Sequence, residues 1–344
     1  MLAILADDLT GALDSGAPFA GRGMHVEVAL ATGAISSALR EAPDVLSINL
    51  GSREIGALAA QRQVERALAA LPAGVRLFKK VDSRLKGHIA AELDAMSFRS
   101  ALAAPAIPAF GRVVKDSCVT GFGVDTPISI AEKLGHHAAF TNIPDMSNQS
   151  EMHTWLDHSE SSGDDLLIGA RGLAEALAER LSGKAAAQTA EIPRGRALFV
   201  IGSRDPITLA QIEALCETVE LHYLPASNGR LTGRSDRSDG SVITLVQAVP
   251  GEDAVNAHDV SRNLAESVYP DLTANASTIL LSGGATAEGV LERMGITRFR
   301  LLGECMPGLG LAHAHGHCII AKSGGFGHPN TLKEIASILL RNMG

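Results

Sequence analysis

The chain opens with the stretch Leu2-Ala3-Ile4-Leu5-Ala6-Asp7-Asp8-Leu9-Thr10-Gly11, an apolar run that ends in two aspartates. Five consecutive apolar residues predict a buried strand, and the aspartates end it. Helix-like spacing follows over 12–20, with Gly16 and Pro18 as interruptions. A strand, a polar turn and a helix in this order are the repeating unit of parallel α/β sheets, so this stretch predicts the fold class.

The same alternation continues along the rest of the chain. Strands are expected at 25–30, 45–50, 76–81, 102–106, 197–201, 242–246, 277–281 and 317–321, and helices at 55–71, 173–181, 208–219, 258–268 and 286–294. The stretch 110–165 is interpreted as a connection with short helices, and the Gly- and Pro-containing stretch 182–195 as a linker. We therefore predict two doubly wound α/β domains with mostly parallel sheets and a ligand cleft between them, over 1–193 and 194–344.

Composition excludes several classes of function. The 344 residues carry 30 basic and 38 acidic side chains, a net charge of -8, which argues against a nucleic-acid or anionic-membrane binder. Aromatic residues make up only 3%, so the core is expected to consist of small and aliphatic side chains. The four cysteines lack paired metal or redox spacing, and no apolar run reaches the ~18 residues of a membrane span. We expect a cytoplasmic protein with reduced cysteines.

Polar residues follow three predicted strands of the first domain. They are Asp7, Asp8 and Thr10 after the first strand, Ser52 and Arg53 after 45–50, and Lys80, Asp82, Ser83, Arg84 and Lys86 at the end of 76–81. Ligands of open α/β sheets bind at the carboxyl ends of strands. The interpretation is that Arg53, Lys80 and Lys86 hold an anion while an aspartate handles a proton or Mg²⁺. The alternative is that the aspartates cap helices and the cations are solvated.

Glycine turns follow three predicted strands of the second domain. These turns are Gly202-Ser203, Ser282-Gly283-Gly284-Ala285-Thr286 and Lys322-Ser323-Gly324-Gly325-Phe326-Gly327. Backbone N–H groups and the positive end of a helix dipole attract phosphate at such turns, so three of them in one domain favour a nucleotide site over ordinary tight turns. Neither the P-loop motif nor G-x-G-x-x-G is present.

Two histidine runs invite a metal interpretation, which we do not adopt. In the run His313, His315, His317, the intervening Gly316 indicates a turn. His136 and His137 are neighbours, and neighbouring side chains on a helix point in different directions. No metal ligands are therefore assigned.

Several segments, in chain order, resemble the four-carbon acid sugar kinase family. They are 6–14, 80–83, Gly202-Ser203 with Thr208 and Gln211, 282–286 and 322–327, with further matches at Pro105, Pro108, Gly111 and Arg112, at 169–177, and at Glu304, Pro307 and Gly308. The match extends over nearly the whole chain. One departure is Lys86, which stands where the family usually has arginine.

The resemblance implies ATP-dependent phosphorylation of a hydroxyl of a four-carbon sugar acid such as D-threonate, D-erythronate or a 3-oxo-tetronate, with Mg²⁺ on the phosphates. It implies an N-terminal substrate domain, with contacts from Asp7, Arg53, Lys80, Asp82, Ser83 and Lys86. It also implies a C-terminal nucleotide domain, with contacts from Ser203, Gly283, Gly284, Ala285, Thr286, Glu304, Gly308, Gly324, Gly325, Phe326 and Gly327. Asp7, Asp8 and Asp82 are the catalytic candidates, and the sequence leaves open whether Asp7 or Asp8 meets the reacting hydroxyl.

Two other classes stay open at this point. One is an NAD(P)-dependent oxidoreductase of a small hydroxy acid, which the missing dinucleotide motif disfavours. The other is a non-catalytic small-anion-binding protein of the same fold. The partners expected are a sugar acid and ATP, with neither nucleic acid nor membrane, and a homodimer is left open.

Overall fold

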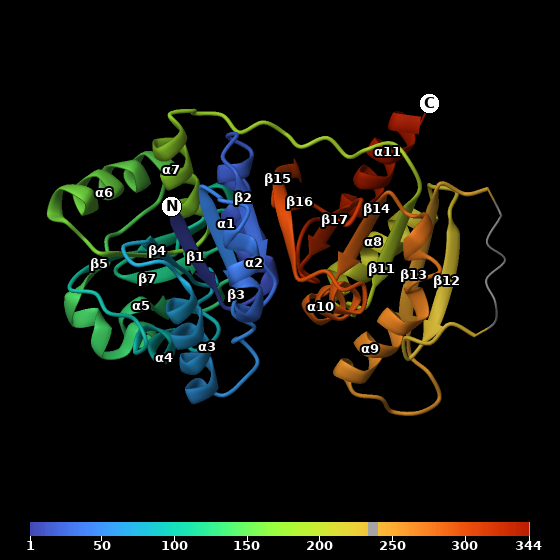
Figure 1. The fold of residues 1–344 in the computed structure, drawn as a ribbon, viewed down its shortest axis with the longest axis horizontal. Helices are drawn as coiled ribbons and strands as arrows, with labels where there is room; N and C mark the ends of the chain where they lie inside the picture. Colours follow the sequence, from blue (N-terminus) through green and yellow to red (C-terminus); the bar gives the residue numbers. More distant parts are fainter. Residues whose placement is uncertain (233–239, 344) are drawn as a thin grey trace. The chain divides into compact units, whose positions relative to one another are not determined.

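The computed structural model describes residues 1–232 and 240–343 and separates into two compact units (Figure 1). The first unit is Met1–Gln188 with Arg298–Gly303, and the second is Thr189–Thr297 with Glu304–Gly344. Each unit has a mostly parallel sheet with helices between successive strands, so the predicted α/β class is confirmed.

The first unit is built on a sheet in which β1 lies in the interior, between β3 and β4. The strands run in the order β2 (Val26–Ala29), β3 (Val45–Asn49), β1 (Leu2–Ala6), β4 (Arg76–Lys80), β10 (Leu166–Gly169), β5 (Ala101–Ala104) and β9 (Thr141–Asn142), all parallel. Ala6 pairs with both Asn49 and Lys80, so β3, β1 and β4 end level with one another. After β1 the chain builds β2 and β3 on one side of this strand and then β4 on the other side. The topological switch point therefore lies at the end of β1.

Helix α1 (Leu9–Ala20) follows β1 and continues through Gly16 and Pro18. A Cβ atom on Gly16 would lie 2.9 Å from Leu301 Cδ2, so glycine lets this helix pack closely against the strand segment beneath it. The other helices of this unit are η1 (Thr32–Ala34), α2 (Ile35–Leu39), α3 (Ala57–Ala70), α4 (Ile89–Leu93), η2 (Pro108–Phe110), α5 (Ile130–Leu134), η3 (Gly135–Phe140), α6 (Gln149–Ser162) and α7 (Arg171–Ser182).

The stretch 110–165 contains the expected short helices α5 and η3, but it is more ordered than a connection. It holds α6 and a three-stranded antiparallel sheet of β6 (Arg112–Lys115), β7 (Cys118–Gly121) and β8 (Ile128–Ser129). The β6–β7 turn uses Asp116 and Ser117, both at positive φ (52° and 57°). Hairpin turns with two residues at positive φ usually carry Asn-Gly, Asp-Gly or Gly-Gly, so Asp116-Ser117 is a weak sequence signal for this hairpin.

The predicted range of the second domain includes a segment that belongs to the first unit. Strand β15 (Arg298–Met306) pairs antiparallel with β2 over Arg298 to Leu301, and the Arg298 guanidinium lies 2.9 Å from Glu27. Phe299 and Leu301 are buried while Arg300 is exposed, an alternation that covers one face of the sheet edge.

The second unit has the strand order β12 (His222–Ser227), β13 (Ile243–Val249), β11 (Ala197–Ile201), β14 (Thr278–Ser282), β17 (His317–Lys322) and β16 (Leu309–Ala314). All pairs are parallel except the β16–β17 hairpin, which turns through His315 and Gly316 at positive φ, as the glycine predicted. The helices are α8 (Pro206–Cys216), α9 (Ala257–Val268), η4 (Thr273–Asn275), α10 (Gly284–Arg293) and α11 (Thr331–Met343).

The two cores consist mainly of alanine, valine, leucine and isoleucine, as the low aromatic content predicted. The fully buried aromatic side chains are Phe19, Phe78, Phe199 and Phe299. All four cysteines are free thiols. Within 1–232 and 240–343, no helix combines the length and apolarity that a membrane span requires.

Candidate active site

The carboxyl ends of β1, β3 and β4 bring together most of the polar residues singled out in the first domain. Arg53 is the centre of this cluster. Its Nε and Nη2 donate to the two carboxylate oxygens of Asp7 at 2.8 and 2.9 Å, its Nη1 donates to Asp8 at 2.6 Å, and Nη2 lies 4.0 Å from Asp82. The bidentate arrangement fixes the planar guanidinium against Asp7.

Asp7 is an ionised carboxylate in a nearly closed environment, since the residue is 2% exposed. Burial alone would raise the pKa of Asp7, but the hydrogen bonds from Arg53 and the charges of Lys79, Arg53 and Lys80 outweigh it and lower that pKa below its usual value. The pKa of Arg53 is raised in turn, because its carboxylate partners outweigh the effect of burial. Both groups are charged at neutral pH.

The Asp8 carboxylate accepts hydrogen bonds from the first turn of α1. It is the N-cap of α1, where one oxygen accepts from the Gly11 N–H at 2.8 Å and the other from the Thr10 hydroxyl at 2.7 Å and from Arg53. The capping alternative therefore holds for Asp8, and its oxygens are more fully used than those of Asp82.

Lys80 ends β4 with its side chain at the same rim. The residue is 4% exposed, and its Nζ lies 3.0 Å from the position that a Cβ on Gly11 would take. Within the described residues its ammonium group makes neither a hydrogen bond nor an ion pair. A buried, unpaired ammonium group is costly unless an anionic ligand completes it, so Lys80 marks a place for an anion.

Asp82 and Ser83 lie on the loop after β4. Asp82 accepts from the Arg84 N–H through one oxygen at 2.8 Å, and Ser83 accepts from Arg112 Nη1 at 2.5 Å. Arg112 comes from β6, which sequence reasoning noted only as part of a motif. Burial and the nearby charge of Arg84 lower the pKa of Arg112.

The assignment of Lys86 to the substrate stays a prediction. Its side chain is exposed and makes no hydrogen bond or ion pair with the residues that the structure describes. The loop turns at Gly87 instead, where φ is +90° and a Cβ atom would lie 2.8 Å from Asp7 Oδ2. Glycine at this position therefore lets the loop close over Asp7.

A buried ion pair beneath the cluster escaped sequence reasoning. Lys79 and Glu92 are 0% and 1% exposed, and their charged atoms lie 2.9 Å apart. Ser52 donates a short hydrogen bond to the same Glu92, and Lys79 also donates to the carbonyls of Leu5 and Lys80. Adjacent side chains on a strand point to opposite faces of the sheet, so Lys79 and Lys80 cannot both lie on the same face. The sequence signal for a buried lysine was therefore this pair of adjacent lysines at the end of a strand.

In the second unit the three glycine turns meet at the ends of β11, β14 and β17. The N–H groups of Gly202 and Ser203 donate to the Ser282 carbonyl, and the N–H of Gly283 donates to the Lys322 carbonyl. Side chains at two of these glycines would clash, since a Cβ on Gly202 would lie 1.9 Å from Thr286 Oγ1 and one on Gly324 would lie 2.2 Å from Ser203 Oγ. The turns are packed against one another through their glycines.

Polar side chains from α8 and β17 hold the last of these turns in place. Thr208 donates to the Gly324 carbonyl at 2.6 Å and Gln211 to the Phe326 carbonyl at 3.0 Å. Lys322, 1% exposed, donates to Thr208 at 3.1 Å and to three carbonyls of the turn. Burial lowers the pKa of Lys322 to about 8.

Helix α10 follows the second of these glycine turns, and its N-terminus is uncapped. Helix α10 begins at Gly284 with no side-chain cap, and Gly284 and Ala285 are exposed. Its unpaired N–H groups and dipole suit an anion. Gly308 lies against the Phe326 ring, 2.2 Å from its Cζ when a Cβ is added, and Glu304 belongs to strand β15.

The two histidine runs differ in what the structure shows. Across the β16–β17 hairpin His313 pairs with Cys318 and His317 pairs with Ala314, so the two histidines are not opposite each other. His136 and His137 lie on η3 with ring centroids 3.9 Å apart, so the expectation that their side chains point in different directions was wrong.

Comparison with known proteins agrees with this two-unit arrangement. Residues 2–139 match a family model described as a sugar-binding N-terminal domain, and residues 198–332 match one described as a nucleotide-binding C-terminal domain. The chain belongs to the four-carbon acid sugar kinase family. As a member of this family it is a phosphotransferase with an alcohol acceptor, the class of its curated relatives.

These curated relatives are D-threonate kinases. The enzyme of Bordetella bronchiseptica is 26% identical over 98% of this chain and 97% of its own length. The enzyme of Cupriavidus necator is 38% identical, over 34% of this chain and 28% of its own length. A crystal structure of a Haemophilus influenzae protein superposes with a TM-score of 0.70 at 18% identity, covering 98% of this chain and all of the other. One from Salmonella typhimurium LT2 reaches 0.73 at 19% identity, covering 96% and 97%; both show the fold.

Proposed function

We propose that this protein is an ATP-dependent kinase that phosphorylates a hydroxyl of a four-carbon sugar acid, with D-threonate as the first candidate and D-erythronate and a 3-oxo-tetronate next. The observation that carries the proposal is the unpaired ammonium group of Lys80 beside Asp7 and Arg53. Such a group suits the substrate carboxylate as a point charge.

In this proposal Asp7, Asp8 and Asp82 have different roles. The second carboxylate oxygen of Asp82 accepts no hydrogen bond from the residues that the structure describes and lies 4.0 Å from Arg53, and the side chain is 22% exposed, so Asp82 receives the acceptor hydroxyl. Asp7 holds Arg53 in place, and Asp8 caps α1. Ser83 follows Asp82 on the same loop and accepts a hydrogen bond from Arg112 of β6, and these two residues contribute hydrogen bonds to other hydroxyls. Phosphoryl transfer depends mainly on positioning and on neutralising charge, which this set supplies.

The nucleotide is proposed to bind at the glycine turns of the second unit, with its phosphates at the start of α10 and beside Gly324, Gly325 and Gly327. Asp205 is the carboxylate that suits a magnesium ion on those phosphates. One of its oxygens caps α8, and the other lies 3.1 Å from the Cβ position of Gly325. Mg²⁺ is commonly held by one carboxylate together with substrate phosphates.

The test is an ADP-release assay with D-threonate, D-erythronate and 3-oxo-tetronates, run on the wild type, Lys80→Met and Lys86→Met. A charged hydrogen bond is worth about 1.5–3 kcal/mol, so Lys80→Met is expected to raise KM for the acid roughly 10- to 150-fold. Lys86→Met is the matched control, since Lys86 lies outside the cluster. Equal effects of the two substitutions would contradict the role of Lys80, and no ADP release with any acid would contradict the function.

A thermal-shift measurement separates the alternatives that the sequence left open. ADP with Mg²⁺ is expected to raise the melting temperature, and NADH is expected to leave it unchanged. The reverse result would favour an oxidoreductase. A cytoplasmic location and a homodimer stay predictions from the sequence.

A further inference from the structure

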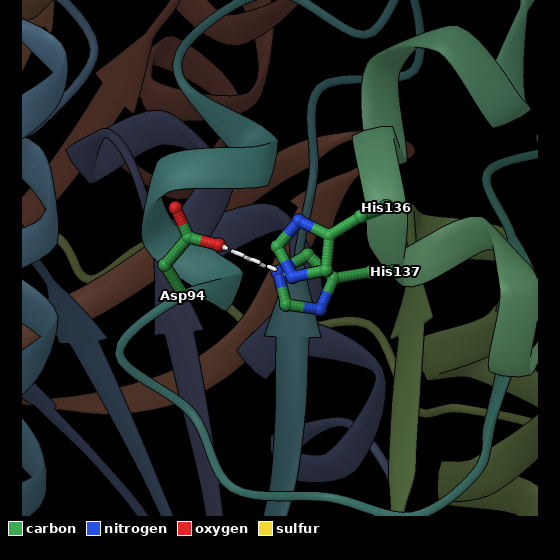
Figure 2. A group of neighbouring side chains, drawn as sticks. All are labelled: Asp94, His136 and His137. Atoms are coloured by element: carbon green, nitrogen blue, oxygen red, sulfur yellow. Dashed lines mark hydrogen bonds and ion pairs between the residues drawn. The ribbon is translucent and has the colours of Figure 1, made fainter.

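A cluster of two histidines and an aspartate lies in the first unit away from the rim described above. His136 and His137 come from η3, and Asp94 is the residue that ends α4 (Figure 2). Figure 2 shows both imidazole rings next to each other, tilted by 35°, and directed toward the same carboxylate. His137 is 7% exposed at its side chain, whereas His136 and Asp94 are 70% and 41% exposed.

The distances in this cluster match those between ligands of one metal ion. Asp94 Oδ1 lies 2.9 Å from His137 Nε2 and 3.7 Å from His136 Nε2, and the ligand atoms of all three residues lie within 4.8 Å of one another. A zinc ion binds nitrogen and oxygen at about 2.0–2.2 Å, which separates neighbouring tetrahedral ligands by roughly 3.5 Å. Small side-chain adjustments would therefore bring all three atoms onto one ion.

Aromatic side chains and a close contact between η3 and α4 hold His137, the buried residue of the three, in place. The His137 ring packs against Phe98 and Phe140, with centroids 5.6 and 5.7 Å away. Gly135, at the start of η3, places its Cβ position 3.3 Å from Ala90 of α4, so the two helices already touch. The site is thus partly preorganised in the folded chain.

We propose that Asp94, His136 and His137 bind a divalent transition-metal ion, Zn²⁺ in particular, with an open position on the exposed side. Two imidazoles and one carboxylate are a donor set for zinc, whereas magnesium requires oxygen ligands. This site is independent of the proposed kinase activity. The ion joins the end of α4 to η3, and α4 carries the Glu92 that supports the substrate rim.

One contact that strengthens metal-bound histidines is missing here. His137 Nδ1 is buried without a hydrogen-bond partner, although ligating histidines usually donate their second N–H to an acceptor. Loss of such a partner weakens metal affinity by about 10- to 100-fold, so we expect micromolar rather than nanomolar binding.

The experiment is a titration of metal-free protein with Zn²⁺ followed by calorimetry, together with the absorption spectrum of the Co²⁺ form. We expect one ion per chain, a Co²⁺ spectrum of low coordination number, and no competition from millimolar Mg²⁺. His136→Ala and Asp94→Asn are each expected to weaken binding at least tenfold. His153→Ala is the control, because His153 forms a similar half-exposed pair with Glu179 at 3.1 Å but lacks a second histidine.

Two results would overturn the proposal. One is the absence of Zn²⁺ binding up to millimolar concentration in the wild type. The other is unchanged affinity in His136→Ala, which folds without difficulty because its side chain is exposed. Hydrogen exchange gives a readout independent of affinity, since Zn²⁺ should slow exchange over 89–94 and 135–141 in the wild type and not in His136→Ala.

Discussion

Replacing Glu92 by glutamine removes one charge from a pair that the first unit buries completely. The Lys79 ammonium, 0% exposed and 2.9 Å from Glu92, would lose the negative charge of this partner and keep neutral oxygen acceptors such as the carbonyls of Leu5 and Lys80. Breaking a buried ion pair from one side costs about 3–5 kcal/mol. For a unit of about 150–250 residues this corresponds to a fall in melting temperature of about 6–20 °C.

Trp155 makes this prediction measurable in one unit of a two-unit protein. It is the single tryptophan of the chain and lies in α6, so its fluorescence reports unfolding of the first unit. The control is Glu160→Gln, because Glu160 pairs with Arg76 and Arg180 at the surface, where an ion pair is worth about 0–1 kcal/mol. The same small loss in both variants would refute the reasoning.

A second variant tests the cause of the loss. In Lys79→Met/Glu92→Gln the buried charge is gone, so most of the lost stability should return. If the double variant is as unstable as Glu92→Gln alone, the unpaired ammonium group is not the reason.

Three further predictions concern the loops. Gly87→Ala forces φ +90° on alanine and places its Cβ 2.8 Å from Asp7 Oδ2, so ADP release should fall more than tenfold at unchanged nucleotide affinity. Gly324→Ala meets Ser203 Oγ at 2.2 Å, so it should weaken ADP binding, measured calorimetrically, and leave the Trp155 transition unchanged. Burial lowers the pKa of Lys322 from 10.5 to about 8, so the folded chain binds fewer protons than the unfolded chain between these values. Relative to Lys322→Met, wild-type stability by calorimetry should rise from pH 8 to pH 10.5.

Local patterns predicted the elements that build each sheet. The apolar runs at β1 and β11 matched the structure to the residue, because both strands are buried on two faces and bounded by polar or glycine turns. The grouping of Asp7, Arg53 and Asp82 also followed, since parallel strands in register must end at one edge. The sequence could not show that Arg53 would bind Asp7 at both oxygens.

What the sequence could not predict were contacts between residues far apart along the chain. The pairing of Arg298 with Ala29 joins positions that no local pattern connects. The convergence of His136 and His137 on Asp94 depends on η3, where the ring centroids lie 3.9 Å apart instead of diverging as on a regular helix. Such contacts are set by tertiary packing, which periodicity does not encode.

Two lysines at strand ends show how the partners of a side chain decide its role. Lys80 and Lys322 each end a parallel strand at a rim, each is almost fully buried, and each precedes a loop that carries serine and glycine. The sequence around the two lysines does not distinguish their roles. Lys322 meets four acceptors and therefore builds its loop, whereas Lys80 meets none among the described residues. Because a buried ammonium group without acceptors is unstable, Lys80 requires a ligand and Lys322 does not. Methionine at Lys80 should therefore reduce substrate affinity, whereas methionine at Lys322 should disturb the turn itself.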